Sequence, residues 1–171
     1  MAYPFFSLSK SHRTAPIDFC AGGVSIRVEA VPDHGMATIW DADILIWAAS
    51  TLNDLKKRGV NDLPRTLSFH PYDLLKTICR ETGGREYRLL REGLARLQST
   101  SIVTNIRVKR GKKQRQFSWI EGWTDLVDED GKQSRGMTLT LSDWFYEGLL
   151  MEGGLLSIDP VYFSITGGRE R

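Results

Sequence analysis

Cysteine is scarce in this sequence, and long apolar runs are absent. Cys20 and Cys79 are the only cysteines among 171 residues, and they stand in neither a metal-binding nor a redox spacing. No uninterrupted apolar stretch approaches 18 residues, and the first ten residues lack the apolar region of a signal peptide. We therefore expect a cytoplasmic protein with reduced thiols and no membrane role.

Sequence motifs of the common enzyme classes are also missing. The sequence contains neither a G-x-x-x-x-G-K-[ST] phosphate-binding loop nor a GxSxG nucleophile motif. Its three histidines are scattered, and His70, which precedes Pro71, is more simply a helix cap than a metal ligand. No pair of carboxylates has a spacing that calls for acid–base chemistry. We expect no enzyme activity, no catalytic residue, no metal site and no cofactor.

The positive charge is concentrated in one short segment. Between Arg107 and Arg115 there are six basic residues and no acidic one, and without these six charges the net charge of +2 would be −4. A local basic cluster on a mildly acidic body is typical of a protein that binds a polyanion at one place. The six residues are Arg107, Lys109, Arg110, Lys112, Lys113 and Arg115.

An acidic stretch follows soon after the basic segment. Residues 121–130 hold five acidic side chains and no basic one, but they lack the alternating oxygen ligands and the glycine of a calcium loop. We interpret this stretch as a solvated loop, or as a negative surface that keeps DNA away from one side.

The hydrophobic pattern predicts an α+β protein. The chain is 41% apolar, which is enough for a packed core in about one domain. Alternation over residues 24–30 indicates a half-buried strand, and Asp41 is a good N-cap for a helix over residues 42–57. The other predictions are strands over 36–40, 66–69, 102–108, 114–120, 137–141 and 155–163, and helices over 71–80, 84–98 and 143–150.

The order helix, helix, helix, hairpin predicts a winged helix-turn-helix domain with additional C-terminal strands and a short helix. We expect residues 1–23 to form an N-terminal extension. Residues 24–166 would form the winged-helix DNA-binding domain, with 121–166 as its extension. Residues 167–171 would be the truncated start of a missing C-terminal region.

The third predicted helix has the pattern of a helix that reads DNA. Its buried face lies within an arc of about 80° that contains Tyr87, Leu90, Leu94 and Leu97. The other side carries arginines, which can donate two parallel hydrogen bonds to guanine or bind phosphate, and an alanine that lets the backbone approach a base. The candidate DNA-binding residues of this helix are Arg85, Arg88, Arg91, Glu92, Ala95 and Arg96.

Plainer explanations exist for both candidate segments. Arginines favour helices and usually lie on solvated faces, and Glu92 can pair with Arg88 or Arg96. A charged tip also keeps a β-hairpin soluble, although such tips usually carry both signs. The basic hairpin is therefore the stronger signal. We predict that it turns at Gly111, contacts the DNA backbone or minor groove, and forms one surface with the helix.

Six stretches of the sequence carry a family resemblance. They are YPFFSLSK at 3–10, GVSIRVEAVP at 23–32, HGMATIWDAD at 34–43, LARLQST at 94–100, FSWI at 117–120 and DWFY at 143–146. Through them the chain resembles the plasmid replication initiator protein A (RepA) family of bacteria over nearly its whole length. The resemblance implies a winged-helix protein that binds repeats in a plasmid origin, starts replication there and has no catalytic residues. Family members continue beyond Gly167-Gly168 into a further helix and basic sequence.

Two functions stand as hypotheses. The first is sequence-specific binding of double-stranded DNA at plasmid origin repeats, which initiates plasmid DNA replication and recruits host replication proteins by contact. The alternative is a winged-helix module for dimerisation or protein interaction, with residues 137–163 and their aromatic side chains as the homodimer interface. A winged-helix transcriptional repressor is a third option, because the same fold serves that role.

Overall fold

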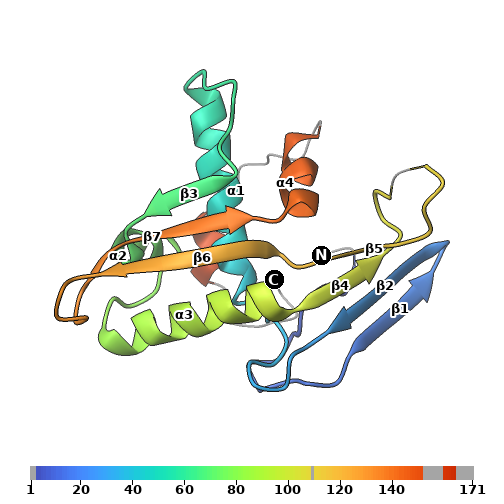
Figure 1. The fold of residues 1–171 in the computed structure, drawn as a ribbon, viewed down its shortest axis with the longest axis horizontal. Helices are drawn as coiled ribbons and strands as arrows, with labels where there is room; N and C mark the ends of the chain where they lie inside the picture. The colour runs from blue at the N-terminus through green and yellow to red at the C-terminus, as the bar shows by residue number, and fades with distance from the viewer. Residues whose placement is uncertain (1–2, 109, 152–159, 165–171) are drawn as a thin grey trace.

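The computed structural model describes residues 3–108, 110–151 and 160–164 (Figure 1). Within these ranges the chain forms four α-helices, seven strands and one 3₁₀ helix, η1. Their bounds are β1 Ile17–Ala21, β2 Val24–Glu29, α1 Ala42–Lys57, β3 Thr66–Phe69, α2 Pro71–Thr77, α3 Gly84–Ser99, β4 Ser101–Thr104, β5 Arg115–Phe117, β6 Ile120–Val127, β7 Ser134–Leu141, α4 Asp143–Leu150 and η1 Pro160–Ser164.

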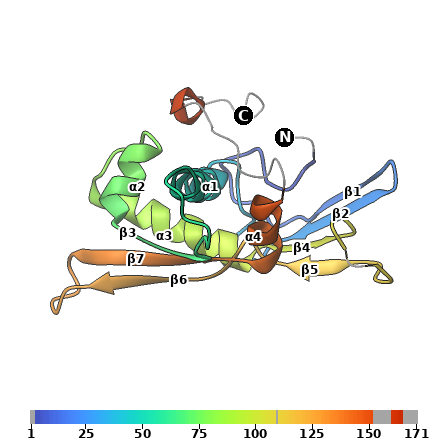
Figure 2. The ribbon, with the colours of Figure 1, turned by 90° about the horizontal axis from the view of Figure 1, so that it is seen from above.

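The strands form two antiparallel sheets. One has the order β1-β2-β4-β5 and the other the order β3-β7-β6. The two sheets occupy opposite ends of the long axis (Figure 1). Seen from above, α1, α2 and α3 lie on one side of the sheet β3-β7-β6 (Figure 2). The sequence prediction of a mixed α+β protein is confirmed at this level.

The core lies between the helices and the sheets, and α3 contributes as its pattern predicts. Leu94 and Leu97 are fully buried and Leu90 is nearly so, whereas Tyr87 is only partly buried. An apolar stripe of this kind drives a helix onto its sheet, because each buried leucine contributes about 1.5–3 kcal/mol of transfer free energy. Away from this stripe, Arg85, Arg88 and Glu92 are exposed.

Several local predictions are confirmed. The helix after Asp41, the strand over 66–69 and the helix from Asp143 to Leu150 are present. Two caps also form as the sequence suggests. The ring Nδ1 of His70 accepts a hydrogen bond from the Tyr72 amide, and the hydroxyl of Ser142 accepts one at the start of α4.

The segment 36–40, predicted as a strand, is not one. Within it only Thr38 makes an isolated bridge, to Ser7. The other backbone groups find partners elsewhere, as when the Ala37 amide donates to the hydroxyl of Thr100 at 2.9 Å. The pattern that suggests a strand therefore reflects burial of this segment between its neighbours and not pairing in a sheet.

The prediction of a solvated loop over 121–130 is also wrong, since most of this stretch is strand β6. β6 pairs with β7 along its length. Two of its carboxylates are compensated by arginines: Glu121 lies 2.5 Å from Arg65, and Asp125 lies 2.7 Å from Arg91. Only the turn between β6 and β7 keeps the acidic, exposed character that the sequence predicts.

The structure describes part of each end of the chain. Residues 17–21, expected in an N-terminal extension, form β1 and pair with β2. Of the strand predicted over 155–163, only residues 160–163 are described, and they belong to the 3₁₀ helix η1. Residues 152–159 and 165–171, including the predicted start of a C-terminal region, lie outside the described residues.

No described helix is long and apolar enough to cross a membrane.

Candidate nucleic-acid interface

The basic segment forms the predicted hairpin. β4 and β5 pair antiparallel, with Ile102 opposite Phe117 and Thr104 opposite Arg115. We call the connecting residues 105–114 the basic loop. Its tip turns at Gly111, whose φ of +85° is readily adopted only by glycine.

Three cationic side chains occupy the tip of the basic loop. Arg110, Lys112 and Lys113 are exposed, and no ion pair engages them within the part of the chain that the structure describes. Lys109, also predicted to contact DNA, lies outside that part. The tip therefore presents several positive charges that are available to a polyanion.

Arg107 lies at the base of the basic loop and turns inward. Its guanidinium carbon lies 3.7 Å from the ring centroid of Trp144 on α4, and its Nη1 donates a hydrogen bond of 2.9 Å to the Trp144 carbonyl. Burial lowers the pKa of the Arg107 guanidinium from its ordinary value. This side chain, predicted as a DNA contact, is committed to α4.

Strand β5 of the hairpin contacts the same helix, α4. Arg115 lies 3.2 Å from a carboxylate oxygen of Glu147. The ring of Phe117 stacks on Trp144, with centroids 4.2 Å apart and an angle of 13° between the planes. The indole N–H of Trp144 donates to the carbonyl of Ile106 at 3.2 Å. α4 thus holds both sides of the basic loop.

The first half of α3 presents two of the predicted arginines to solvent. Arg85 and Arg88 are exposed. Arg88 Nε lies 3.7 Å from Glu92, and both side chains are at least half exposed, so this pair contributes little and can open for a ligand. Ala95, one turn further on, is half-buried.

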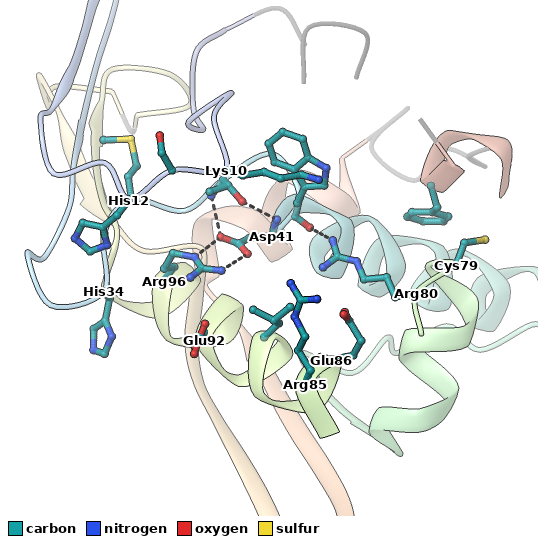
Figure 3. A pocket seen from close by; sticks show the side chains of 17 residues that line it. Lys10, His12, His34, Asp41, Cys79, Arg80, Arg85, Glu86, Glu92 and Arg96 are labelled. Carbon is teal, nitrogen blue, oxygen red and sulfur yellow. Dashed lines mark hydrogen bonds and ion pairs between the residues drawn. The ribbon is translucent and has the colours of Figure 1, made fainter. Parts of the chain in front are cut away.

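The other two predicted arginines of α3 are tied to other elements. Arg91 Nε donates to Asp125 on β6 at 2.7 Å. Arg96 donates to both carboxylate oxygens of Asp41 at 2.7 and 2.9 Å (Figure 3). These hydrogen bonds raise the pKa of Arg96 despite its partial burial. The geometry of both pairs is that of structural ion pairs.

A cleft of about 640 Å³ lies beside α3 (Figure 3). Arg85 lines it together with Arg80 and Arg96. Arg80 donates to Asp43 and to a backbone carbonyl, so two of these three guanidinium groups already have partners. Lys10 also lines the cleft, and so do the acidic residues Asp41, Glu86 and Glu92, so its charges nearly balance. The cleft therefore favours neither an anion nor a cation.

The basic loop and the exposed arginines of α3 do not form one surface. The start of α3 and the basic loop lie toward opposite ends of the long axis in both views (Figures 1 and 2). The hairpin next to α3 is β6–β7, which shares a sheet with β3, and its turn carries the acidic residues 128–130. The prediction of a single edge formed by helix and basic hairpin is therefore wrong.

Of the aromatic residues that the sequence suggested as an interface, Trp144 points inward. Trp144 is 6% exposed and packs on Trp119 and Phe117. The hydroxyl of Tyr146 donates to the carbonyl of Leu63. Trp144 therefore belongs to the core that supports the basic loop, whereas Phe145, Tyr146, Tyr162 and Phe163 are only partly buried.

Sequence reasoning missed the importance of two residues of α4, Trp144 and Gly148. Trp144 contacts both sides of the basic loop, and Gly148 leaves the space that the Arg107 guanidinium occupies. The only sequence signal that could have found Trp144 is its place in the stretch DWFY.

No group of three or more His, Cys, Asp or Glu that could hold a metal ion occurs among the described residues.

The comparison with known families decides the relationship of the chain. The sequence profile described as "RPA: Replication initiator protein A" matches residues 1–171. The chain belongs to the replication initiator protein A family. The resemblance inferred from the six sequence stretches is confirmed. A relative from Wigglesworthia glossinidia brevipalpis, described as "Putative replication protein", is 33% identical over 173 residues, covering the whole chain and 62% of the relative.

Solved structures of RctB domains have a similar fold. A crystal structure of domains 2 and 3 of RctB superposes with a TM-score of 0.67 at 13% identity, covering 92% of this chain and 64% of that one. A second crystal structure of RctB domains 2–3 gives a TM-score of 0.65 at 12% identity, covering 92% and 61%. At this identity the likeness establishes the fold. The chain spans less than two thirds of the length of the Wigglesworthia relative and of each crystallised RctB chain.

Proposed function

We propose that this chain is the part of a plasmid replication initiator that binds double-stranded DNA at repeats in the origin, and that the full protein starts replication there. The observation that carries the proposal is the tip of the basic loop. Its cations, Arg110, Lys112 and Lys113, are exposed and without ion-pair partners among the described residues, on a hairpin that α4 holds in place. Membership of the replication initiator protein A family supports it.

We assign a winged-helix arrangement to one half of the molecule. The elements α1, β3, α2 and α3 are followed by the hairpin β6–β7, and the sheet order β3-β7-β6 is that of a winged helix. In this assignment α3 is the reading helix, and the wing is the acidic turn between β6 and β7. The basic hairpin β4–β5 is then an insertion between the reading helix and the wing strands.

The two cationic surfaces would do different work. Arg85 and Arg88 on the open side of α3 would contact base edges in the major groove. The basic loop would bind phosphates at a second position along the duplex, which fixes orientation and supplies affinity without reading sequence. Arg91 and Arg96 keep their carboxylate partners and act on the stability of α3.

The proposed role is binding and does not include catalysis. Recruitment of host replication proteins would follow from contacts made once the initiator is seated on the origin. Specificity would come from α3, and affinity would come largely from counterion release at the basic loop.

The experiment is a binding titration by fluorescence anisotropy on origin-repeat DNA and on scrambled DNA of equal length. We expect the chain to prefer the repeats by at least about fivefold, since one good bidentate arginine–guanine contact is worth about 1–3 kcal/mol. Equal affinity for the two DNAs would contradict sequence-specific binding.

The variant Arg110→Gln/Lys112→Gln/Lys113→Gln tests the loop in the same titration. We expect weaker binding to both DNAs by the same factor, because phosphate contacts carry no sequence information. The matched control is Lys56→Gln/Lys57→Gln/Arg58→Gln at the end of α1, which removes the same charge from another part of the surface. If the control weakens binding as much as the loop variant, only the net charge of the chain matters.

A further inference from the structure

Arg107 has an unusual backbone conformation for an arginine. Its φ is +53°, in the left-handed region that residues other than glycine and asparagine rarely adopt. Such a conformation persists only where the surrounding contacts compensate for it. Here the compensating contacts are the Trp144 ring face at 3.7 Å and the Trp144 carbonyl at 2.9 Å.

We propose that Arg107 is a positioning residue of the basic loop and not a DNA contact, and that Gly148 is required because its missing side chain makes room for the Arg107 guanidinium. This inference rests on the proposed function of the loop as a phosphate-binding element. It adds two residues, Gly148 and Trp144, to the set on which DNA binding depends.

The contacts of Arg107 support positioning over phosphate binding. One face of its guanidinium is covered by the indole of Trp144, and Nη1 is used by a backbone carbonyl. The side chain is half-buried, whereas Arg110, Lys112 and Lys113 at the tip are exposed. A phosphate would have to displace contacts that Arg107 already makes, but it meets no such competition at the tip.

Gly148 gives the inference a sharp test that leaves every charge in place. A Cβ added at Gly148 would lie 2.6 Å from both Nη atoms of Arg107. Because the guanidinium is the far end of a flexible side chain, the variant Gly148→Ala should displace Arg107 and preserve α4, since alanine favours helices. The matched control is Gly122→Ala in β6, where an added Cβ meets nothing within 4 Å.

The first measurement needs no DNA. Limited trypsin digestion followed by mass spectrometry gives the rate of cleavage after Arg110, Lys112 and Lys113. We expect Gly148→Ala and Arg107→Ala to be cleaved at the tip about five- to tenfold faster than wild type, because a stacked cation–π contact and a hydrogen bond no longer oppose opening of the loop. Gly122→Ala should be cleaved at the wild-type rate.

The second measurement is the salt dependence of DNA binding. We expect Gly148→Ala to weaken binding about three- to tenfold, because the loop must then be ordered on binding, with a slope of log K against log salt that stays near the wild-type value. Arg107→Lys keeps the charge but loses the planar stacking, so it should behave like Gly148→Ala and not like wild type.

Three results would overturn the inference. One is tip cleavage of Gly148→Ala at the wild-type rate. The second is an Arg107→Lys variant that binds DNA as tightly as wild type. The third is a slope of log K against log salt that becomes shallower by about one unit in Arg107→Ala but not in Gly148→Ala, as loss of one phosphate contact would produce. If the wild-type chain binds no DNA, the proposed function fails, while the digestion still decides whether Arg107 and Gly148 hold the loop.

Discussion

At the scale of single residues, Asp41 is the side chain on which the surroundings of α3 most depend. It is 5% exposed in its side chain and accepts hydrogen bonds from the Thr38 amide and from two nitrogens of Arg96. Gly93 on α3 lets the helix approach, since a Cβ there would lie 2.8 Å from Asp41 Oδ1. One carboxylate therefore joins the segment before α1 to the middle of α3.

We predict that Asp41→Ala lowers the free energy of unfolding by about 2–4 kcal/mol, because it leaves the partly buried Arg96 without its partner. Urea denaturation followed by tryptophan fluorescence measures the change. Glu92→Ala is the control, because its pair with Arg88 is exposed and 3.7 Å long, and it should cost less than about 0.5 kcal/mol. Similar losses for the two variants would contradict the structural role of Asp41.

At the scale of elements, local patterns predicted what local interactions determine. The apolar stripe of α3 was sufficient for that helix, because its periodicity follows from which face is buried. The alternation over 102–108 and 114–120 found the hairpin but predicted strands that are too long, since β4 ends at Thr104 and β5 spans only Arg115–Phe117. β6 was missed because its acidic residues Glu121 and Asp125 suggest a loop until Arg65 and Arg91, distant in sequence, are brought beside them. The segment 36–40 was misjudged for the same reason, since its partners are tertiary.

α3 carries both the arginines that we propose to read DNA, Arg85 and Arg88, and the arginines that pair with carboxylates of other elements, Arg91 and Arg96. We predict that Arg88→Gln reduces the preference for origin repeats over scrambled DNA by about 1–2 kcal/mol, with stability unchanged to within about 0.5 kcal/mol. Arg91→Gln should lower stability and leave the preference for origin repeats unchanged, because it breaks the 2.7 Å bond to Asp125. Anisotropy titrations and urea denaturation on both variants give the two quantities, and an identical pattern for both would refute the division.

At the scale of the whole molecule, the topology separates the basic loop from the acidic turn. The basic loop lies toward one end, and the acidic turn between β6 and β7 toward the other (Figures 1 and 2). The sequence places the basic and acidic segments next to each other, and only the assignment of β4–β5 and β6–β7 to different sheets separates them. That separation is a property of the topology, so no local pattern could predict it.

The acidic turn gives a prediction at this scale. If the turn between β6 and β7 is the wing beside α3, its charges disfavour DNA there. We predict that Glu129→Gln/Asp130→Asn strengthens binding to scrambled DNA about two- to threefold at low salt, and that the gain disappears at high salt because of screening. A gain that persists at high salt would point to a changed fold in place of relieved repulsion.

The most direct test of the account is the slope of log K against log salt for wild type and for Arg110→Gln/Lys112→Gln/Lys113→Gln. Each phosphate contact contributes about 0.9 to the slope, so three lost contacts should make it shallower by about 2–3 units. The variant with three charges removed at the end of α1 should keep the wild-type slope. A loop variant with an unchanged slope would show that the exposed cations of the basic loop do not bind the DNA backbone.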